Sequence, residues 1–417
     1  MTLTQATQSA RHVRVERTLL VIGVAALGFN LRGAITSLPP VFPELEASSL
    51  HLSTATVSVL AATPVLCFAV VSGFAAALAR RFGEERALFA AMVALTAGLL
   101  LRGAAPAAAL FPGTILASSA IAVMNVLLSS LIKRRWPERA GFLIGLYITA
   151  LSAGAITGSL VSVPLWQASG GSIALTLGWL AAPAALGALL WMPQLKRARL
   201  QRGTVRPAEK NPGDSAPHAT APRPVAVYRH ALAWQVMVFM GTQSLLYYAA
   251  LSWLPTILRD RGLSAGSAGD LLALMGVGNL AVSLLVPIVA QRMRTQYALV
   301  VPTVITLTVG LAGLVYAPVD GAVIWALILG AGQNAALGLA IFFTAARAPH
   351  AAAAASLSAM SQGAGYLLAS AGPLEVGLLH SATGSWTPPL AVLFALSAVL
   401  LVAGLLAARP RVLPAEG

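Results

Sequence analysis

The chain has little charge and almost no cysteine. Only 10% of its 417 residues are Asp, Glu, Lys or Arg, whereas soluble domains carry about 25% charged residues. This shortage disfavours a soluble globular protein. The single cysteine, Cys67, lies inside an apolar run, so no disulfide can form within the chain and we expect a buried structural thiol.

Patterns that hold metals or nucleotides, or that catalyse reactions, are missing as well. The six histidines are scattered near the ends of apolar runs and in loops, without the spacing of a metal site. The chain has no Gly-x-x-x-x-Gly-Lys loop, which argues against ATP-driven pumping. No spacing indicates a Ser/His/Asp arrangement. We therefore expect no enzyme, no cofactor and no metal.

Long apolar runs are abundant. Hydrophobic residues make up 58% of the chain, and a run of about 20 apolar residues can cross a bilayer as a helix. The pattern predicts an all-α polytopic membrane protein with twelve transmembrane helices in two pseudo-symmetric six-helix bundles. The expected spans lie at about 18–41, 53–79, 86–102, 107–131, 140–166, 172–192, 230–257, 264–290, 297–317, 321–345, 351–379 and 387–407.

The net charge of +14 comes mainly from Lys and Arg in the loops. In a soluble protein such a charge would suggest nucleic acid, but here the positive-inside rule explains it. Only Arg102, Arg259 and Arg261 are expected on the outer side. The distribution predicts a multi-pass protein of the cell inner membrane with both termini cytoplasmic. The lipid bilayer is then its partner and nucleic acid is not.

One long loop divides the chain. Residues 193–229 are basic and proline-rich, which predicts a disordered linker. The expected organisation is a cytoplasmic tail at 1–17, a six-helix bundle at 18–192, the linker at 193–229, a second bundle at 230–408 and a tail at 409–417. Short repeats support two related halves, since Leu52-Ser53 recurs as Leu263-Ser264. Duplicated halves around a midplane site are typical of transporters.

Arg32 is the most informative residue of the first span. It lies past the middle of the apolar run, where a charge costs roughly 2.5–3.5 kcal/mol on insertion scales. We expect it to anchor an anionic substrate, because few of the 13 acidic residues lie within spans. A planar guanidinium suits a planar anion. The alternative is a structural charge bonded to backbone carbonyls or to Asn or Tyr side chains.

Other polar residues within the spans must face protein or water. Thr36 shares the helix face of Arg32, whereas Asn30, two positions away, does not. The remaining candidates for the substrate site recur at helical spacing or lie in corresponding helices of the two halves. They are Asn125, Tyr147, Gln243, Tyr247, Gln333, Asn334, Gln362 and Tyr366. For each of them the alternative is hydrogen bonding between helices.

Two acidic residues are candidates for proton coupling. Glu375 lies within a span, toward its outer end, where a carboxylate close to hydrocarbon can carry a proton. Asp270 lies near the start of another span, and its alternative is an exposed charge at a helix start.

The loop after the second span runs from Gly73 to Arg86 and contains Arg80, Arg81 and Gly83. It resembles the glycine- and charge-rich loop between helices two and three of the major facilitator superfamily. Arg80 stands where that family usually has an aspartate, so the usual acidic lock of the inward gate is altered. The resemblance implies that Arg80, Arg81, Gly83 and Arg86 belong to a gating loop.

Longer stretches narrow the resemblance. They are Asn30 to Leu45, Met124 to Pro137, Phe239 to Pro255, Ser361 to Pro373 and His380 to Trp386. Together they are similar to the cyanate/2-nitroimidazole (CynX/NimT) branch of that superfamily. The resemblance implies two six-helix bundles around a central cavity, alternating access, and cyanate-sized anions or small heteroaromatic compounds as the substrate class.

The function we expect is secondary active transport of a small anionic solute, with uptake by proton symport and a monomer as the working unit. Efflux of small neutral toxic or heteroaromatic compounds is the alternative within transport. A non-transporting membrane sensor or a membrane enzyme is the remote alternative. A sensor would need an output domain, and neither the tails nor the linker provides one.

Overall fold

The computed structural model describes residues 3–50, 52–104, 107–204 and 227–414. Within these ranges all regular structure is helical, so the predicted all-α class is confirmed. The elements are α1 (Leu3–Thr36), η1 (Pro39–Val41), α2 (Phe42–Ala47), α3 (Thr54–Phe82), α4 (Glu84–Arg102), α5 (Ala107–Arg135), η2 (Pro137–Arg139), α6 (Ala140–Ala168), α7 (Ile173–Gly178), α8 (Ala181–Thr204), η3 (Val227–Arg229), α9 (Ala231–Asp260), α10 (Ala265–Arg292), α11 (Tyr297–Tyr316), η4 (Val319–Gly321), α12 (Ala322–Ala346), α13 (Ala351–Thr383) and α14 (Thr387–Ala407).

Twelve of these helices are long, because α2 and α7 have six residues each and every other α-helix has at least 19. Eight stretches of the described chain are long and apolar enough to cross a membrane. The stretches that meet this criterion do not include α4, α9, α10 or α13 as full spans. In a bilayer, the polar and charged residues of these helices must face protein or water.

Serine caps begin the corresponding helices of the two halves. Ser53 Oγ accepts a hydrogen bond from the Thr56 backbone N–H at 3.2 Å, and Ser264 Oγ accepts one from Ser267 at 3.1 Å. Each serine thereby satisfies one of the free N–H groups in the first turn of α3 or α10. The repeated Leu-Ser pair of the sequence therefore marks equivalent helix starts.

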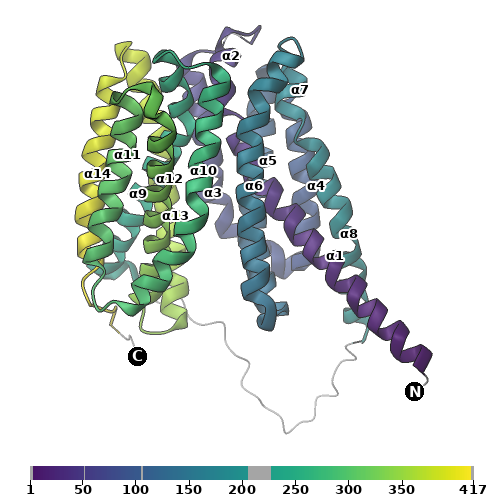
Figure 1. Ribbon diagram of the computed structural model, residues 1–417. Helices are drawn as coiled ribbons and strands as arrows, with labels where there is room; N and C mark the ends of the chain where they lie inside the picture. Colours follow the sequence, from purple (N-terminus) through teal and green to yellow (C-terminus); the bar gives the residue numbers. More distant parts are fainter. Residues whose placement is uncertain (1–2, 51, 105–106, 205–226, 415–417) are drawn as a thin grey trace.

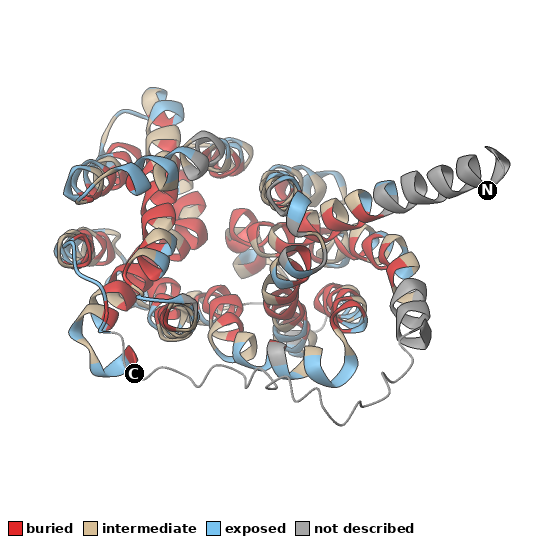
Figure 2. Ribbon diagram, turned by 90° about the horizontal axis from the view of Figure 1, so that it is seen from below, coloured by how far each residue is buried: buried red, intermediate tan, exposed pale blue. Residues whose placement is uncertain are grey.

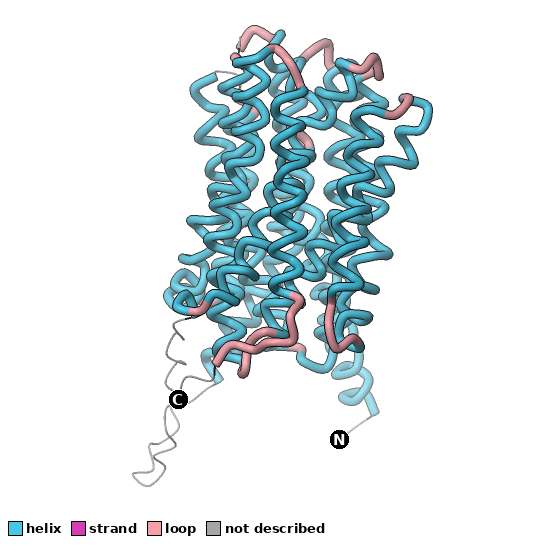
Figure 3. Tube along the Cα trace, turned by 90° about the vertical axis from the view of Figure 1, so that its left-hand side faces the viewer, coloured by secondary structure: helices cyan, strands magenta, loops and turns pink. Residues whose placement is uncertain are grey.

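The helices run side by side along one axis (Figure 3). Figure 1 shows α9 and α11 to α14 on one side, α1 and α4 to α8 on the other, and α3 and α10 between them. We call α1 to α8 the N-terminal group and α9 to α14 the C-terminal group. The two groups meet where α3 packs on α13 and where α6 packs on α10. In a view along the helices, buried residues concentrate on their inner sides (Figure 2).

The two ends of the molecule differ. The end of α8, the start of α9 and the end of α14 lie at one end (Figure 1), called here the linker end. α2 lies at the opposite end, called the α2 end. Helix α8 continues to Thr204, past the predicted start of the linker at 193. Residues 205–226 of that linker lie outside the described residues, as do most side chains of the predicted tail 1–17.

The two groups touch at the α2 end. Arg259 of α9 donates to Glu44 of α2, with Nη1 at 2.7 Å from Oε1, and the rings of Phe42 and Trp253 lie 6.0 Å apart. A Cβ added to Gly377 of α13 would collide with Ser58 of α3. Close contact across the α2 end therefore closes the path between the groups there.

The linker end is more open. A Cβ added to Gly73 of α3, Gly145 of α6 or Gly363 of α13 would meet no atom within 4 Å. These three glycines lie in the linker-end halves of α3, α6 and α13. The same helices make the contacts between the two groups. The close contacts between the groups described here therefore lie at the α2 end, and open space beside α3, α6 and α13 lies at the linker end.

Candidate functional site

A cavity between the two groups is lined by α1, α6, α9, α10 and α12, with about 440 Å³ of space between atoms, counting its mouth. Helices of both groups contribute, so the cavity lies between the N-terminal and the C-terminal group. Its lining residues are Arg32, Thr36, Leu151, Ser152, Ala155, Ile156, Ser159, Tyr247, Leu251, Leu272, Ala273, Met275, Gly276 and Gln333.

Arg32 is the one charged residue of this lining, which contains no carboxylate. Its Cζ lies 4.8 Å from the centre of the Tyr247 ring. Among the described residues the guanidinium makes no ion pair and no hydrogen bond, and its electrostatic neighbours are Tyr147, Tyr247, Tyr248 and Tyr366. A cation stacked on an aromatic face gains attraction, yet its N–H donors stay available. The Arg32 guanidinium therefore has N–H donors available for a molecule that enters the cavity.

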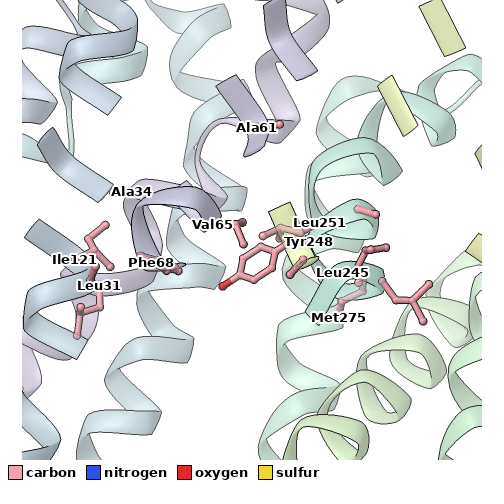
Figure 4. Packing of buried hydrophobic residues seen from close by; sticks show 14 of the residues in the cluster. Leu31, Ala34, Ala61, Val65, Phe68, Ile121, Leu245, Tyr248, Leu251 and Met275 are labelled. Atoms are coloured by element: carbon pink, nitrogen blue, oxygen red, sulfur yellow. The ribbon is translucent and has the colours of Figure 1, made fainter. Parts of the chain in front are cut away.

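Four tyrosines surround this guanidinium from three helices. Tyr147 on α6 donates to Asn125 Oδ1 on α5 at 2.5 Å. The rings of Tyr247 and Tyr248 meet edge to face at 5.0 Å, and Tyr366 of α13 lies 6.0 Å from the Phe68 ring. Figure 4 shows the Tyr248 ring extending from α9 toward Val65 and Phe68 of α3. Aromatic rings therefore form much of the surroundings of Arg32.

Gln333 contributes a second polar group to the cavity. The side chain of this α12 residue is 3% exposed, and its Nε2 has no hydrogen-bond partner among the described residues. A buried amide without a partner costs about 1–3 kcal/mol, so such a group calls for a ligand contact. The lining thus offers N–H donors from both groups of helices.

Thr36 lines the cavity as predicted, but its hydroxyl serves the helix packing. Thr36 Oγ1 donates to the Ala155 carbonyl of α6 at 2.9 Å. Next to it, α1 and α6 cross through glycines, since a Cβ on Gly33 would lie 2.9 Å from the Gly154 carbonyl oxygen. This close crossing sets the position of Arg32, which lies one residue away from Gly33.

Several predicted site residues lie outside the cavity lining. Asn30 Nδ2 donates to the Pro183 carbonyl at 3.1 Å, which links α1 to α8. Gln243 Nε2 donates to Ser244 Oγ at 2.6 Å, and Asn334 Nδ2 donates to the Gly330 carbonyl at 3.0 Å. Gln362 is exposed and donates to Ser358 Oγ at 2.9 Å. Asn30 thus bonds between helices, as the alternative expects, whereas the other three amides bond within their own helices.

The candidate proton carriers and the gating loop also lie away from the cavity lining. Both carboxylate oxygens of Glu375 are buried without a partner among the described residues, whereas Asp270 is exposed. Arg80, Arg81 and Arg86 are exposed at the linker end, and Gly83 has a φ of 89° between α3 and α4. The adjacent Glu84 pairs with Arg134 of α5 at 2.8 Å.

Sequence reasoning missed two serines and a buried arginine. Ser152 and Ser159 of α6 line the cavity, and their spacing of seven residues on one helix face was the available signal. Arg102, expected at an outer loop, is 3% exposed and donates to the carbonyls of Ala34 at 2.8 Å and Leu177 at 3.0 Å. Arg102 is thus buried and bonded to backbone carbonyls, whereas Arg32 is half-buried and has no such bond among the described residues.

Comparison with known proteins places the chain among membrane transporters. The family model described as Major Facilitator Superfamily matches residues 18–373. The chain is 38% identical over 400 residues to the uncharacterized transporter YycB of Bacillus subtilis (strain 168), with 95% of each chain covered. It is 35% identical over 395 residues to the 2-nitroimidazole transporter of Escherichia coli (strain K12), covering 95% of this chain and 96% of that one. The cyanate transport protein CynX of the same organism is 28% identical over 369 residues, with 88% and 91% covered.

Solved structures agree on the fold. A bacterial homolog of the human lysosomal transporter Spinster, inward-facing and unoccupied, superposes with a TM-score of 0.70 at 17% identity, covering 96% of this chain and 99% of that one. At this identity the likeness shows the fold alone, which is the twelve-helix arrangement predicted from hydropathy.

Proposed function

Because the chain belongs to the Major Facilitator Superfamily of membrane transporters, we propose that it carries a small organic anion across the membrane by alternating access. The resemblance to the CynX/NimT branch is confirmed by relatives at 28–38% identity. Transport of a small solute by a multi-pass membrane protein follows from the family. The anionic nature of the solute is our proposal.

The observation that carries the proposal is the unpaired guanidinium of Arg32 in a cavity lining without a carboxylate. An arginine is always charged in proteins, and Arg32 is half-buried, where a charge without a partner is costly. A carboxylate or a comparable planar anion can accept two parallel N–H bonds from the fork. A bound anion would therefore supply the negative charge that the described lining does not contain.

The rest of the lining indicates how such an anion would be held. Gln333 Nε2 can donate to a second acceptor of the substrate, and Tyr247 covers one face of the guanidinium. Leu251, Leu272 and Met275 supply an apolar wall. We propose that the substrate is small, planar and partly apolar. We retain Asn125, Tyr147 and Tyr366 as supporting residues of this site and treat Asn30, Gln243, Asn334 and Gln362 as helix-packing residues.

The state of the molecule fits one step of alternating access. The α2 end is closed by contacts between the groups and the linker end stands open. With both termini cytoplasmic, as the basic loops predict, this is the inward-open state of an inner-membrane carrier. Glu375 remains our candidate for a coupled proton in a symport, because its buried carboxylate has no partner among the described residues.

The proposal is tested by equilibrium binding and thermal stabilisation with cyanate, benzoate and 4-hydroxybenzoate, each compared with a neutral amide analogue. Ligand binding to the folded state raises apparent stability by mass action. Replacing Arg32 by Gln should weaken anion binding by about 30-fold or more, since removing one partner of a desolvated charge pair costs about 2–5 kcal/mol. The matched control is Arg409→Gln, an exposed arginine after α14, which should bind like the wild type.

The outcome that contradicts the proposal is equal binding of an anion by the wild type and Arg32→Gln. Stabilisation by neutral compounds alone would favour the second candidate, transport of small heteroaromatic compounds. That candidate is supported by the apolar wall of the cavity and by the 35% identical relative named as a 2-nitroimidazole transporter. It predicts that Arg32→Gln keeps the affinity for such compounds.

A further inference from the structure

The α2 end of the molecule holds a cluster of charged and aromatic side chains that the substrate cavity does not use. Glu44 and Glu46 come from α2, in the N-terminal group. Asp260 is the last residue of α9, and His380 lies in the last turn of α13, both in the C-terminal group. The cluster therefore bridges the two groups where they are closed.

Glu44 already has a partner. Nη1 of Arg259 lies 2.7 Å from Oε1 and 2.8 Å from Oε2 of Glu44. Arg259 and Glu44 therefore compensate each other across the interface. The neighbouring Glu46 and Asp260 depend on other groups for compensation.

His380 is held by aromatic packing next to one of these carboxylates. Its imidazole stacks on the indole of Trp386, with ring centres 3.7 Å apart and planes 7° from parallel. The same indole donates from Nε1 to Asp260 Oδ2 at 2.8 Å. Nδ1 of His380 is buried and has no hydrogen-bond partner among the described residues. His380 and Asp260 thus contact the same indole, that of Trp386.

Glu46 approaches from the other group. His380 and Asp260 both lie within electrostatic reach of its carboxylate, and Thr54 at the start of α3 also faces it. Oε1 of Glu46 is buried without a hydrogen-bond partner among the described residues. Where the α2 end is closed, carboxylates from opposite groups therefore lie within electrostatic reach of each other and of His380.

We propose that Glu46, Asp260 and His380 form a proton-binding site that stabilises closure of the α2 end. A proton on His380 supplies the positive charge between the two carboxylates, and the imidazolium gains attraction from the face of Trp386. When the groups separate at this end, Glu46 leaves and water replaces it. Acid therefore favours the closed end, and alkali favours its opening.

This inference rests on the alternating access of the proposed function and not on the identity of the substrate. Its test therefore uses no substrate. The reporter is Ala61→Cys in a Cys67→Ser background. Ala61 is 9% exposed and shares the α3 face of Ser58 and Phe68, which contact Gly377 and Tyr366 of α13. A thiol at this position reacts with a maleimide only when the groups part.

The measurement is the rate of maleimide labelling of purified protein in detergent at about pH 5.5 and 7.5. Each rate is divided by that of Val319→Cys, an exposed position at the start of the short 3-10 helix η4, which corrects for thiol ionisation. We expect the corrected rate to fall about fivefold or more on acidification, the lower end of ordinary coupling between sites.

Variants that remove the titrating group and a variant that keeps a permanent positive charge together distinguish a proton site from a damaged fold. His380→Gln and Glu46→Gln should each abolish the pH dependence, whereas His380→Lys should keep labelling slow at both pH values. The matched control is His350→Gln at the linker end, where Nδ1 accepts the Ala353 N–H at 3.2 Å, and it should label like the wild type. A pH-independent rate in the wild type, or an unchanged pH response in His380→Gln, overturns the inference.

Discussion

The crossing of α1 and α6 gives the sharpest stability prediction. A Cβ added to Gly154 would collide with the Phe29 carbonyl oxygen and lie 2.8 Å from the Phe29 carbonyl carbon. Both atoms belong to backbone, so no side-chain rotation can relieve the contact. Gly145 lies on the same helix, and a Cβ added there meets no atom within 4 Å. The same substitution at these two glycines should therefore have opposite effects.

The magnitudes follow from packing and helix propensity. Carbon atoms in contact lie about 3.5–4.0 Å apart, so Gly154→Ala must separate α1 from α6 by roughly 1 Å. Overpacking of this kind costs about 1–3 kcal/mol, against which Ala gains about 0.5–1 kcal/mol over Gly in a helix. We expect Gly154→Ala to be destabilised by about 1–2 kcal/mol and Gly145→Ala to be stabilised by up to about 1 kcal/mol.

The assay is thermal unfolding of both variants and the wild type in the same detergent, followed by anion binding. Gly154→Ala should melt a few degrees lower and bind more weakly, because Phe29 lies one turn before Arg32 on α1 and the displacement reaches the guanidinium. Gly145→Ala should melt at or above the wild type. A Gly154→Ala protein as stable as the wild type would show that α1 and α6 do not cross as closely as the structure indicates, and the reasoning fails.

Two further predictions concern the cavity. Tyr247→Phe should keep anion affinity within about twofold, because the aromatic ring remains. Tyr247→Leu removes the ring whose centre lies 4.8 Å from the Arg32 guanidinium, so it should lose about 0.5–2 kcal/mol of binding free energy. Equal affinities of the two variants in binding titrations would contradict this role of the ring. Gln333→Met should raise the melting temperature of the ligand-free protein, because an apolar chain replaces a buried amide that has no partner among the described residues and costs about 1–3 kcal/mol. The same variant should bind the anion more weakly. A lower melting temperature would show that the amide has a partner in solution.

Hydropathy was sufficient to predict the long helices, because a chain that crosses a bilayer must satisfy its backbone hydrogen bonds within itself. The repeated Leu-Ser pairs also located equivalent helix starts, since Ser53 and Ser264 cap α3 and α10. The short helix α2 was not foreseen, because Phe42–Ala47 follows two prolines and joins an apolar run without a clear break. Its six residues nevertheless carry the contact that closes one end of the molecule.

The candidate site was only partly predictable. Arg32, Thr36, Tyr247 and Gln333 line one cavity, but the sequence could not separate them from other polar residues of the same helices. Gln243 lies one turn before Tyr247 and shares its stripe, yet it bonds to Ser244 at a level where α9 packs tightly on α13. Which polar residues meet a cavity depends on where helices cross, and a helical stripe alone does not contain that information.

Arg32 and Arg102 show that the sequence is equally limited in predicting which charged residues have partners. In the sequence Arg102 stands at the end of an apolar run and Arg32 within one, so only Arg32 looked costly. In the structure Arg32 is half-buried at the cavity, whereas Arg102 is buried and bonded to carbonyls of Ala34 and Leu177 that are distant in the chain. Since backbone acceptors leave no signature in the sequence, a buried arginine can be recognised as satisfied or unsatisfied only after the helices are placed.

The search for a proton site has an equivalent bias. Sequence reasoning looks for acids deep within spans, because a carboxylate there is costly, and so it selects Glu375. Glu46, Asp260 and His380 lie near helix ends, where charges are usually solvated and carry little information. An alternating-access carrier, however, must close one of its ends at every turn of its cycle, and closure brings such surface charges out of water. The α2 end meets this condition, since Glu46 Oε1 and His380 Nδ1 are buried there without hydrogen-bond partners among the described residues. Proton dependence in this fold can therefore originate at a gate as well as at a membrane-buried acid, and the His380 variants distinguish the two.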